Sequence, residues 1–444
     1  MIRTLLVLML ASTAVLAKSE DLSGDWAGEL NTGSASIHLI LHLKGDGGTW
    51  ESVEQHGTIP IQKIEVHERT VLIDAGIAKF TGTLDASGQS MAGTFRQGSG
   101  ELPLSFRKGG PVARAARRSQ EPQRPFPYTE EEVAYAGAGG VVLAGTLTCP
   151  KSGGPFAAAL LISGSGAQDR DETIFGHKPF LVLSDWLTRM GFAVLRVDDR
   201  GTGKSQGVFE KATYDDKVAD VLAGIAFLKT RKDVNAAMVG LIGHSEGGSI
   251  GPLAATRSDV AFVVMLAGMG VPGEQVLRQQ GIDVARSAGA SEAMITKQLE
   301  TQSRMFAIVR GTPDRPTAEA QLRELLGSGA AADQQIHAVY SPTFQDLLRF
   351  DPGPVLRRLA CPVLAVNGSQ DRQVSAAQNL PAIAKALADS QSQDWAVVEL
   401  PGLNHLFQTS KTGGIAEYAT IDETMAPSAL KAIGDWLSGR FPRK

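Results

Sequence analysis

Hydrophobic and polar residues alternate along the first part of the chain. Apolar residues occupy positions 37, 39, 41 and 43, and the same period of two recurs in the segments 80–84, 91–95 and 102–106. Turn-forming sequences such as Asp85-Ala-Ser-Gly88 separate these segments. The pattern is typical of strands that bury one face. It predicts a small antiparallel β domain over residues 22–108.

The next stretch, residues 109–127, is rich in Arg, Pro and Gln and has no apolar period. Such a composition is typical of an extended linker whose side chains are solvated. We therefore expect a linker here, between the β domain and a second, larger domain over residues 128–444.

The period changes after the linker. Residues 131–136 and 141–148 alternate like two strands of a hairpin, and continuous apolar runs follow at 156–162, 192–197, 238–244, 260–266, 362–366 and 395–400. Residues at helical spacing lie between these runs, for example Phe180, Leu183, Trp186 and Leu187, which would share one buried face. Strands without alternation are buried on both faces, so this order predicts a parallel sheet with helices on both sides, an α/β sandwich.

One long stretch interrupts the alternation of strands and helices. Residues from about 270 to 356 are rich in Ala, Gln, Leu and Glu, with helical spacing and no strand-like run. This predicts a helical cap inserted into the sandwich. A last helix is expected at about 427–437.

The composition is that of a globular protein with an ample core. The chain has 444 residues, 43% of them hydrophobic and 20% charged, and a formal net charge of −4. This length exceeds one ordinary domain. The small negative charge gives no electrostatic footprint for nucleic acid or for an anionic membrane. Neither partner is expected, and a small soluble substrate is favoured.

The first 17 residues have the features of an export signal. Arg3 precedes an apolar run from Leu5 to Leu10, and small residues follow up to Ala17. This order is typical of a secretory signal peptide, and the run is too short to span a bilayer. No later segment has the length and apolarity of a membrane span. We expect a periplasmic or secreted protein with no membrane span in the mature chain; the alternative is an N-terminal anchor that is kept.

The two cysteines, Cys149 and Cys361, are expected to be free thiols. Several predicted strands separate them, and neither has the spacing of a metal ligand. No metal site and no organic cofactor are predicted.

The candidate chemistry centres on Gly243-His-Ser-Glu-Gly247. This G-x-S-x-G sequence ends a predicted strand and begins a helix of small residues, which is the setting of a nucleophile elbow. In such a turn the serine adopts a strained backbone conformation, and glycines are needed because side chains two residues away would collide. Ser245 is the predicted nucleophile. The alternative is a glycine-rich turn before a helix.

A serine hydroxyl attacks a carbonyl only when a base removes its proton and an acid orients that base. Asp371 and His405 each follow the end of a predicted strand, so they should lie at the same sheet edge as Ser245. The chain order Ser, Asp, His is that of an α/β-hydrolase. His244 is expected to point away from the site, since neighbours on a turn diverge.

The oxyanion of a tetrahedral intermediate also needs hydrogen-bond donors. The elbow offers the backbone N–H of Glu246. The second donor is expected in the glycine-rich loop after the strand 156–162, where Ser165 is the first choice and Gly166 the neighbouring possibility.

Four motifs, in order, resemble those of bacterial α/β-hydrolases grouped with the serine aminopeptidase-like hydrolases, and especially secreted carboxylesterases. They are Ser163-Gly-Ser-Gly-Ala-Gln-Asp-Arg-Asp171, Gly176-His-Lys-Pro-Phe180, Asp198-Asp-Arg-Gly-Thr-Gly203 and Gly243-His-Ser-Glu-Gly-Gly248. The resemblance covers residues of about 128–444 and leaves out the β domain. It implies an α/β-hydrolase sandwich and ester hydrolysis through an acyl-enzyme, without metal or cofactor.

Three functions are compatible with these residues. The first is a carboxylesterase acting on a small-molecule ester. The second is a serine exopeptidase of the same fold, which would need an acidic group in the cap to hold a substrate amine; the cap offers Glu274, Glu292, Glu300, Glu319 and Glu324. The third is a binding protein on an inactive hydrolase scaffold, which the intact set of serine, aspartate and histidine disfavours.

Overall fold

The computed structural model describes residues 22–31, 36–45, 47–52, 57–76, 78–97, 100–109 and 118–442. The chain divides into two compact units, the first up to residue 113 and the second from residue 114 onward, apart from residues 54–56. Each unit is described by itself. The predicted signal segment 1–17 lies outside the described residues.

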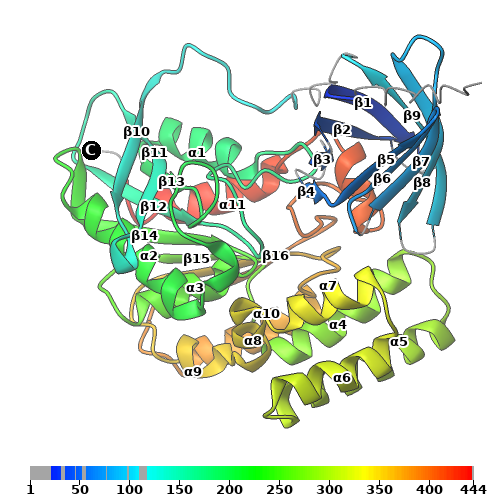
Figure 1. Ribbon diagram of the computed structural model, residues 1–444. Coiled ribbons are helices and arrows are strands. Elements are labelled where there is room, and N and C mark those ends of the chain that lie inside the picture. The colour runs from blue at the N-terminus through cyan, green and yellow to red at the C-terminus, as the bar shows by residue number, and fades with distance from the viewer. Residues whose placement is uncertain are drawn as a thin grey trace, which may run out of the picture. The chain divides into compact units, whose positions relative to one another are not determined.

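The first unit is one antiparallel sheet of nine strands (Figure 1). Its order is β4-β3-β2-β1-β9-β8-β7-β6-β5, so most neighbours in the sheet are also neighbours in sequence. The strands are β1 Gly24–Asn31, β2 Ser36–Lys44, β3 Gly47–Ser52, β4 Gly57–Ile61, β5 Lys63–His67, β6 Thr70–Asp74, β7 Ala78–Leu84, β8 Ser90–Gln97 and β9 Gly100–Lys108.

Alternation places one face of every strand of this sheet in a single core. In β7, buried and exposed residues alternate without exception. Trp26, Phe80 and Phe106 are fully buried, and the rings of Phe80 and Phe106 meet edge to face with 5.2 Å between centroids. The predicted period of two therefore has its expected cause, a sheet that buries one face.

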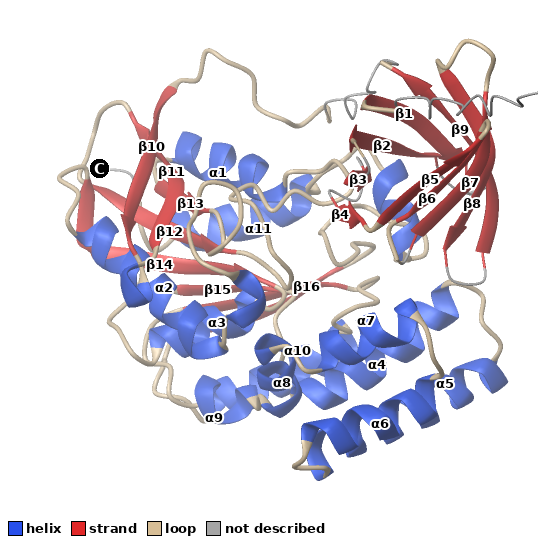
Figure 2. Ribbon diagram, viewed as in Figure 1, coloured by secondary structure: helices blue, strands red, loops and turns tan. Residues whose placement is uncertain are grey.

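The second unit contains a mixed sheet of eight strands (Figure 2). Its order is β10-β11-β13-β12-β14-β15-β16-β17. The pairs β10–β11 and β11–β13 are antiparallel, and every later pair is parallel. The strands are β10 Tyr128–Ala136, β11 Val142–Pro150, β12 Phe156–Ile162, β13 Ala193–Val197, β14 Val234–His244, β15 Val263–Leu266, β16 Val363–Gly368 and β17 Trp395–Leu400.

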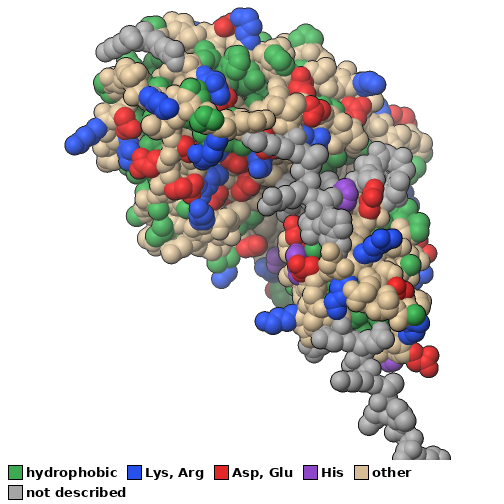
Figure 3. Space-filling model, turned by 90° about the horizontal axis from the view of Figure 1, so that it is seen from above, with side chains coloured by type: hydrophobic (Ala, Val, Ile, Leu, Met, Phe, Trp, Pro, Cys, Tyr) green, Lys and Arg blue, Asp and Glu red, His purple; other side chains and the backbone are tan. Residues whose placement is uncertain are grey.

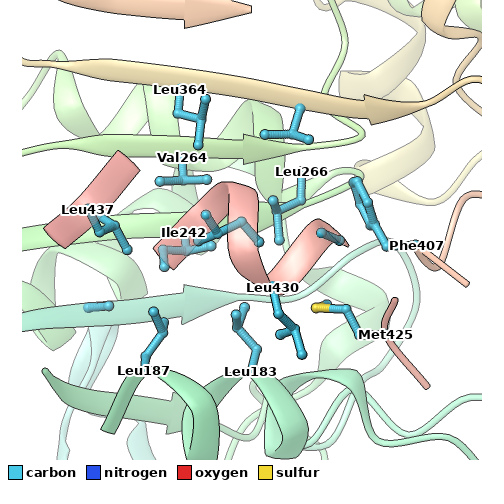
Figure 4. Packing of buried hydrophobic residues seen from close by; sticks show 14 of the residues in the cluster. Leu183, Leu187, Ile242, Val264, Leu266, Leu364, Phe407, Met425, Leu430 and Leu437 are labelled. Carbon is cyan, nitrogen blue, oxygen red and sulfur yellow. The ribbon is translucent and has the colours of Figure 1, made fainter. Parts of the chain in front are cut away.

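Helices cover both faces of this sheet, as predicted. Alternate residues of the central strands face opposite sides, so Ile242 and Val264 contact one helical layer while Leu241 and Val263 contact the other. Figure 4 shows the first side, where Leu183 and Leu430 meet the sheet. The helices of that side are α1 Pro179–Met190 and α11 Pro427–Ser438, and those of the other are α2 Tyr214–Lys229, α3 Gly247–Ala255 and α10 Ala376–Ala388.

Trp186 departs from the prediction for α1. Phe180, Leu183 and Leu187 are buried as expected, but Trp186 is 38% exposed. Its indole nitrogen lies beside Gly434 of α11, at the margin of the interface between the two helices. Helical spacing defines a face, and a large ring at the edge of that face remains partly in solvent.

The stretch between β15 and β16 is a set of helices, as the sequence predicts (Figure 1). It has a hydrophobic cluster of its own, built around Phe306, Leu322 and Ile336. The helices are α4 Gly273–Ser287, α5 Glu292–Gly311, α6 Arg315–Leu326, α7 Ala330–Val339, α8 Pro342–Arg349 and α9 Pro352–Leu356.

The expectation of a solvated linker over residues 109–127 is wrong for its second half. The guanidinium of Arg118 donates hydrogen bonds to the backbone carbonyls of Phe175, Ala419 and Ile421. The Gln120 side chain accepts from two backbone N–H groups at residues 424 and 425 and donates to a carbonyl there. Composition did not reveal this docking, because polar side chains that satisfy backbone groups leave no apolar period.

Three further findings concern the chain as a whole. Both cysteines are free, with Cys149 buried in the core. No helix among the described residues has the length and apolarity needed to cross a membrane. On the face seen in Figure 3, basic and acidic side chains are interspersed, in keeping with the small net charge.

Candidate active site

The predicted nucleophile lies in a sharp turn between β14 and α3. Ser245 has a φ of 53°, in the left-handed region that residues other than glycine rarely adopt. A Cβ atom at Gly243 would lie 2.0 Å from the carbonyl oxygen of Gly247, and one at Gly247 would lie 2.1 Å from that of Ile162. Both glycines are therefore required, as the elbow geometry predicts.

Hydrogen bonds hold this strained turn in place. The Ser245 N–H donates to the carbonyl of Leu266, at the end of β15, at 2.8 Å. The Ser245 carbonyl accepts from the N–H of Gly248 at 2.9 Å. The strain is thus maintained by the neighbouring strand and by the first turn of α3.

Asp371 and His405 lie in loops after β16 and β17, and the structure brings both to Ser245. His405 Nδ1 is 2.8 Å from Asp371 Oδ2, and His405 Nε2 is 3.1 Å from Ser245 Oγ. The Asp371 side chain is fully buried, and that of His405 is 5% exposed. The parallel order of β14, β15, β16 and β17 explains the arrangement, because parallel strands end at one edge.

The second carboxylate oxygen of Asp371 fixes the orientation of the group. Asp371 Oδ1 accepts from the backbone N–H groups of Gln373 and Val374, each at 2.8 Å. Oδ2 is then the oxygen that faces His405 Nδ1. A carboxylate can only accept there, so Nδ1 carries the proton and Nε2 is left as the acceptor for the Ser245 hydroxyl.

The two predicted oxyanion donors are the backbone N–H groups of Glu246 and Ser165. Among the described residues, none accepts a hydrogen bond from the backbone N–H of Glu246 or of Ser165. Ser165 is exposed, in the loop that packs on the elbow. A Cβ atom at the adjacent Gly164 would lie 3.3 Å from Ser245 Cβ, so the loop passes close to the nucleophile. The two donors remain predictions.

Two buried residues next to the site were not foreseen. His244 does not point away from the site: its ring centroid is 4.9 Å from that of His405, and its Nδ1 is 2.9 Å from Glu172 Oε1. The side chains of His244 and Ser245 do leave the chain in different directions. The loop that carries His405 nevertheless reaches the His244 ring, whose Nε2 lies 3.0 Å from the His405 carbonyl oxygen. A sequence signal existed, since an acidic residue follows the glycine-rich loop, but its partner lies 72 residues further along the chain.

A small cavity of about 70 Å³ lies beside the glycine-rich loop after β12, which we call the oxyanion loop after its predicted role. Residues that line the cavity include Gly164, Asp199 and Glu246. Glu246 pairs with Lys217 Nζ at 2.6 Å. Burial raises the pKa of the Asp199 carboxyl to about 7, although the hydrogen bond from the N–H of Gln168 opposes this shift. The cavity thus contains charged groups within reach of the nucleophile's turn.

The described residues contain no group of three or more His, Cys, Asp or Glu side chains arranged to hold a metal ion. A serine hydroxyl, a histidine acceptor and a buried carboxylate in a hydrogen-bonded series form the arrangement that activates a nucleophile for acyl transfer.

Comparisons with known proteins identify relatives of this chain. The chain is 26% identical over 354 residues to Esterase EstD of Thermotoga maritima, covering 80% of this chain and 78% of that protein. A match that covers 80% of the chain is longer than residues 128–444, so it must begin upstream of residue 128. The similarity therefore reaches further than the four motifs had indicated.

Solved structures of similar fold include an esterase of Pyrococcus furiosus, 13% identical with a TM-score of 0.45 over 70% of this chain and 91% of that one. A ferulic acid-bound esterase from Butyrivibrio proteoclasticus is 17% identical, with a TM-score of 0.42 over 69% of this chain and 99% of that one.

The comparison with protein families identifies the family of the chain. Residues 139–397 match the family described as X-Pro dipeptidyl-peptidase (S15 family). The match includes Ser245 and Asp371, ends before His405, and covers more than half of the chain. The α/β-hydrolase resemblance inferred from the four motifs is thereby confirmed, and the chain belongs to the X-Pro dipeptidyl-peptidase (S15) family.

Proposed function

We propose that this protein is a serine hydrolase that cleaves carboxylic esters of small molecules through an acyl-enzyme intermediate. The observation that carries the proposal is the hydrogen-bonded series from Ser245 Oγ through His405 to Asp371. The similarity to Esterase EstD supports esters as the substrate class. The intact series disfavours a binding protein on an inactive scaffold.

The reaction follows from the positions of the protons. His405 Nε2 accepts the hydroxyl proton as Ser245 Oγ attacks the ester carbonyl, and the buried charge of Asp371 stabilises the imidazolium that forms. The N–H groups of Glu246 and Ser165 would receive the oxyanion. His405 then returns the proton to the leaving alcohol. A water molecule, activated by the same nitrogen, releases the acid and restores the serine.

A peptidase is the second candidate, and the family match is the observation that favours it. A peptidase that removes residues from the N-terminal end of a peptide must hold the substrate amine, for which a free acidic group is suited. Three of the five acidic residues proposed for this role, Glu274, Glu292 and Glu319, form ion pairs with arginines of the inserted helices. Paired carboxylates attract an additional cation weakly, which leaves Glu300 and Glu324 as the candidates for this role.

A panel of substrates distinguishes the two candidates. Short-chain p-nitrophenyl esters and Xaa-Pro and aminoacyl anilides are assayed side by side, with Ser245→Ala as the control for background hydrolysis. We expect kcat/KM for the best ester to exceed that for every anilide, and a fluorophosphonate probe to label Ser245 alone. Efficient anilide hydrolysis would instead select the peptidase. Labelling of another serine would contradict the site itself.

We also propose that the protein acts in the periplasm or outside the cell. This proposal rests on the composition of residues 1–17. Expression of the full chain with analysis of the mature N-terminus tests it: cleavage near Ala17 and recovery outside the cytoplasm are expected. An uncleaved cytoplasmic protein would overturn it.

A further inference from the structure

A buried acid and a buried histidine join the three parts of the candidate active site. Glu172 and His244 are 3% and 6% exposed. Glu172 Oε1 accepts from the Gly164 N–H at 2.7 Å and lies 2.9 Å from His244 Nδ1. His244 Nε2 lies 3.0 Å from the backbone carbonyl oxygen of His405. One pair thus connects the oxyanion loop, the strand before the nucleophile and the loop of the catalytic base.

Counting protons shows what this connection requires. The carbonyl of His405 can only accept, so His244 Nε2 must carry a proton. Oε1 of Glu172 already accepts from Gly164, and a second proton must lie between Oε1 and His244 Nδ1. All three contacts are satisfied together when the pair holds this proton, either as a carboxylate beside an imidazolium or as a carboxylic acid beside a neutral imidazole. Burial lowers the pKa of His244, but the charge and hydrogen bond of Glu172 outweigh it and raise this pKa above its usual value.

The pair is poorly suited to serve as a source of stability alone. Glu172 Oε2 has no hydrogen-bond partner among the described residues. It belongs to a wall of a cavity of about 10 Å³ whose other residues are mainly apolar, such as Phe180 and Phe407. Desolvation of a buried ion pair commonly offsets most of its attraction. The contribution of the pair is to geometry, because it holds the Gly164 N–H and the His405 carbonyl in fixed positions near Ser245.

The backbone around Glu172 is rigid enough for this task. Its φ is 52°, and its N–H donates to the carbonyl of Asp169. The Asp169 side chain in turn accepts from the N–H groups of Asp171 and Thr173. Glu172 therefore projects from a tight turn that is held by its own hydrogen bonds.

We propose that Glu172 and His244 are positioning residues for the reaction: they hold the oxyanion loop at Gly164 and the loop of His405 at fixed distances from the Ser245 hydroxyl. This inference rests on the proposed ester hydrolysis. Neither side chain is required to touch the substrate. Their loss should therefore impair the transition state, where oxyanion and imidazolium form, more than it impairs the binding of the ester.

The variant Glu172→Gln tests the proposal with little change in shape. If the amide oxygen accepts from the Gly164 N–H, a neutral His244 has only one proton for two acceptors, the amide oxygen and the His405 carbonyl. If the amide NH₂ group takes that position instead, it donates to His244 Nδ1 but cannot accept from Gly164. We expect kcat per active site, titrated with a fluorophosphonate, to fall at least tenfold while KM changes less than threefold. The affinity for a trifluoromethyl ketone that mimics the tetrahedral intermediate should fall in parallel with kcat/KM.

Asp394→Asn is the matched control, because it removes a carboxylate that pairs with Arg440 before the start of β17, at the opposite edge of the sheet. Its kcat should stay within twofold of the unmodified protein. His244→Gln is the second variant, and it should reproduce the loss if Glu172→Gln does not fold. In the double variant the losses should not add, since the two residues act as one unit.

The possible failures are separable. If the unmodified protein hydrolyses esters in a Ser245-dependent manner and a folded Glu172→Gln or His244→Gln variant retains kcat per site within threefold, the positioning role is refuted and the proposed function stands. A rise in KM with unchanged kcat would also refute it, because that result indicates a binding role. If the unmodified protein has no such activity, both proposals fail.

Discussion

Replacing Asp371 by asparagine tests the candidate triad most directly, because the surrounding hydrogen bonds dictate how the amide must sit. Oδ1 of Asp371 accepts from two backbone N–H groups, those of Gln373 and Val374. An asparagine must keep its oxygen on those two donors. Its NH₂ group is then directed at His405 Nδ1, where the carboxylate oxygen lay at 2.8 Å.

This forced orientation reverses the proton pattern of the histidine. Nδ1 must accept from the amide, so the proton of neutral His405 moves to Nε2, which is 3.1 Å from Ser245 Oγ. In that tautomer Nε2 cannot take the serine proton, and no negative charge stabilises the imidazolium. The corresponding change in a well-studied serine protease lowers kcat about 10⁴-fold. A factor of that size equals about 5.5 kcal/mol of transition-state free energy.

The assay is the hydrolysis of one short-chain p-nitrophenyl ester by the unmodified protein and by Asp371→Asn. We expect kcat to fall by about three to four orders of magnitude, roughly 4 to 5.5 kcal/mol, with KM nearly unchanged, and circular dichroism to show an intact fold. A loss of less than about tenfold, roughly 1.4 kcal/mol, in a folded variant would refute the reasoning, since it would mean that another group orients His405.

Two further predictions follow from groups around the site. The pKa of Asp199 is raised by burial from 3.8 to about 7, so the folded protein keeps a proton there that the unfolded chain has already lost between about pH 4 and 7. The free energy of unfolding therefore falls as the pH rises through this window. Measured by urea unfolding, Asp199→Asn should be more stable than the unmodified protein by about 1 kcal/mol or more at pH 8.5, with a smaller difference at pH 4.5. An equal difference at both pH values would contradict this account. A fragment beginning at Arg118 should hydrolyse a small ester with kcat close to that of the full chain. The free energy of unfolding of a fragment beginning at Glu121 should be lower by about 2 kcal/mol or more, because the carbonyls of Phe175, Ala419 and Ile421 lose a charged donor. Equal melting temperatures for the two fragments would show that the docking of residue 118 contributes nothing.

The local patterns of the sequence determined the elements and much of the candidate site. Strands such as β12 and β17 have the predicted bounds, and the helix α11 begins at the predicted residue. Ser245, Asp371 and His405 were identifiable because each lies in the turn or loop after a strand, and parallel strands end at one edge of a sheet. Their juxtaposition needed only this rule of topology. Their role in catalysis remains a prediction.

The tertiary structure alone decided which distant groups meet behind that edge. Glu172 and His244 are 72 residues apart, and Arg118 and Ala419 are 301 residues apart. Periodicity reports which face of an element is buried, but it does not report which polar partner a loop brings to that face. Trp186 shows the same limit, since its spacing gave its face while the packing of α11 decided its exposure. Pairing between loops depends on how the whole sheet is assembled, and that is a property of the fold.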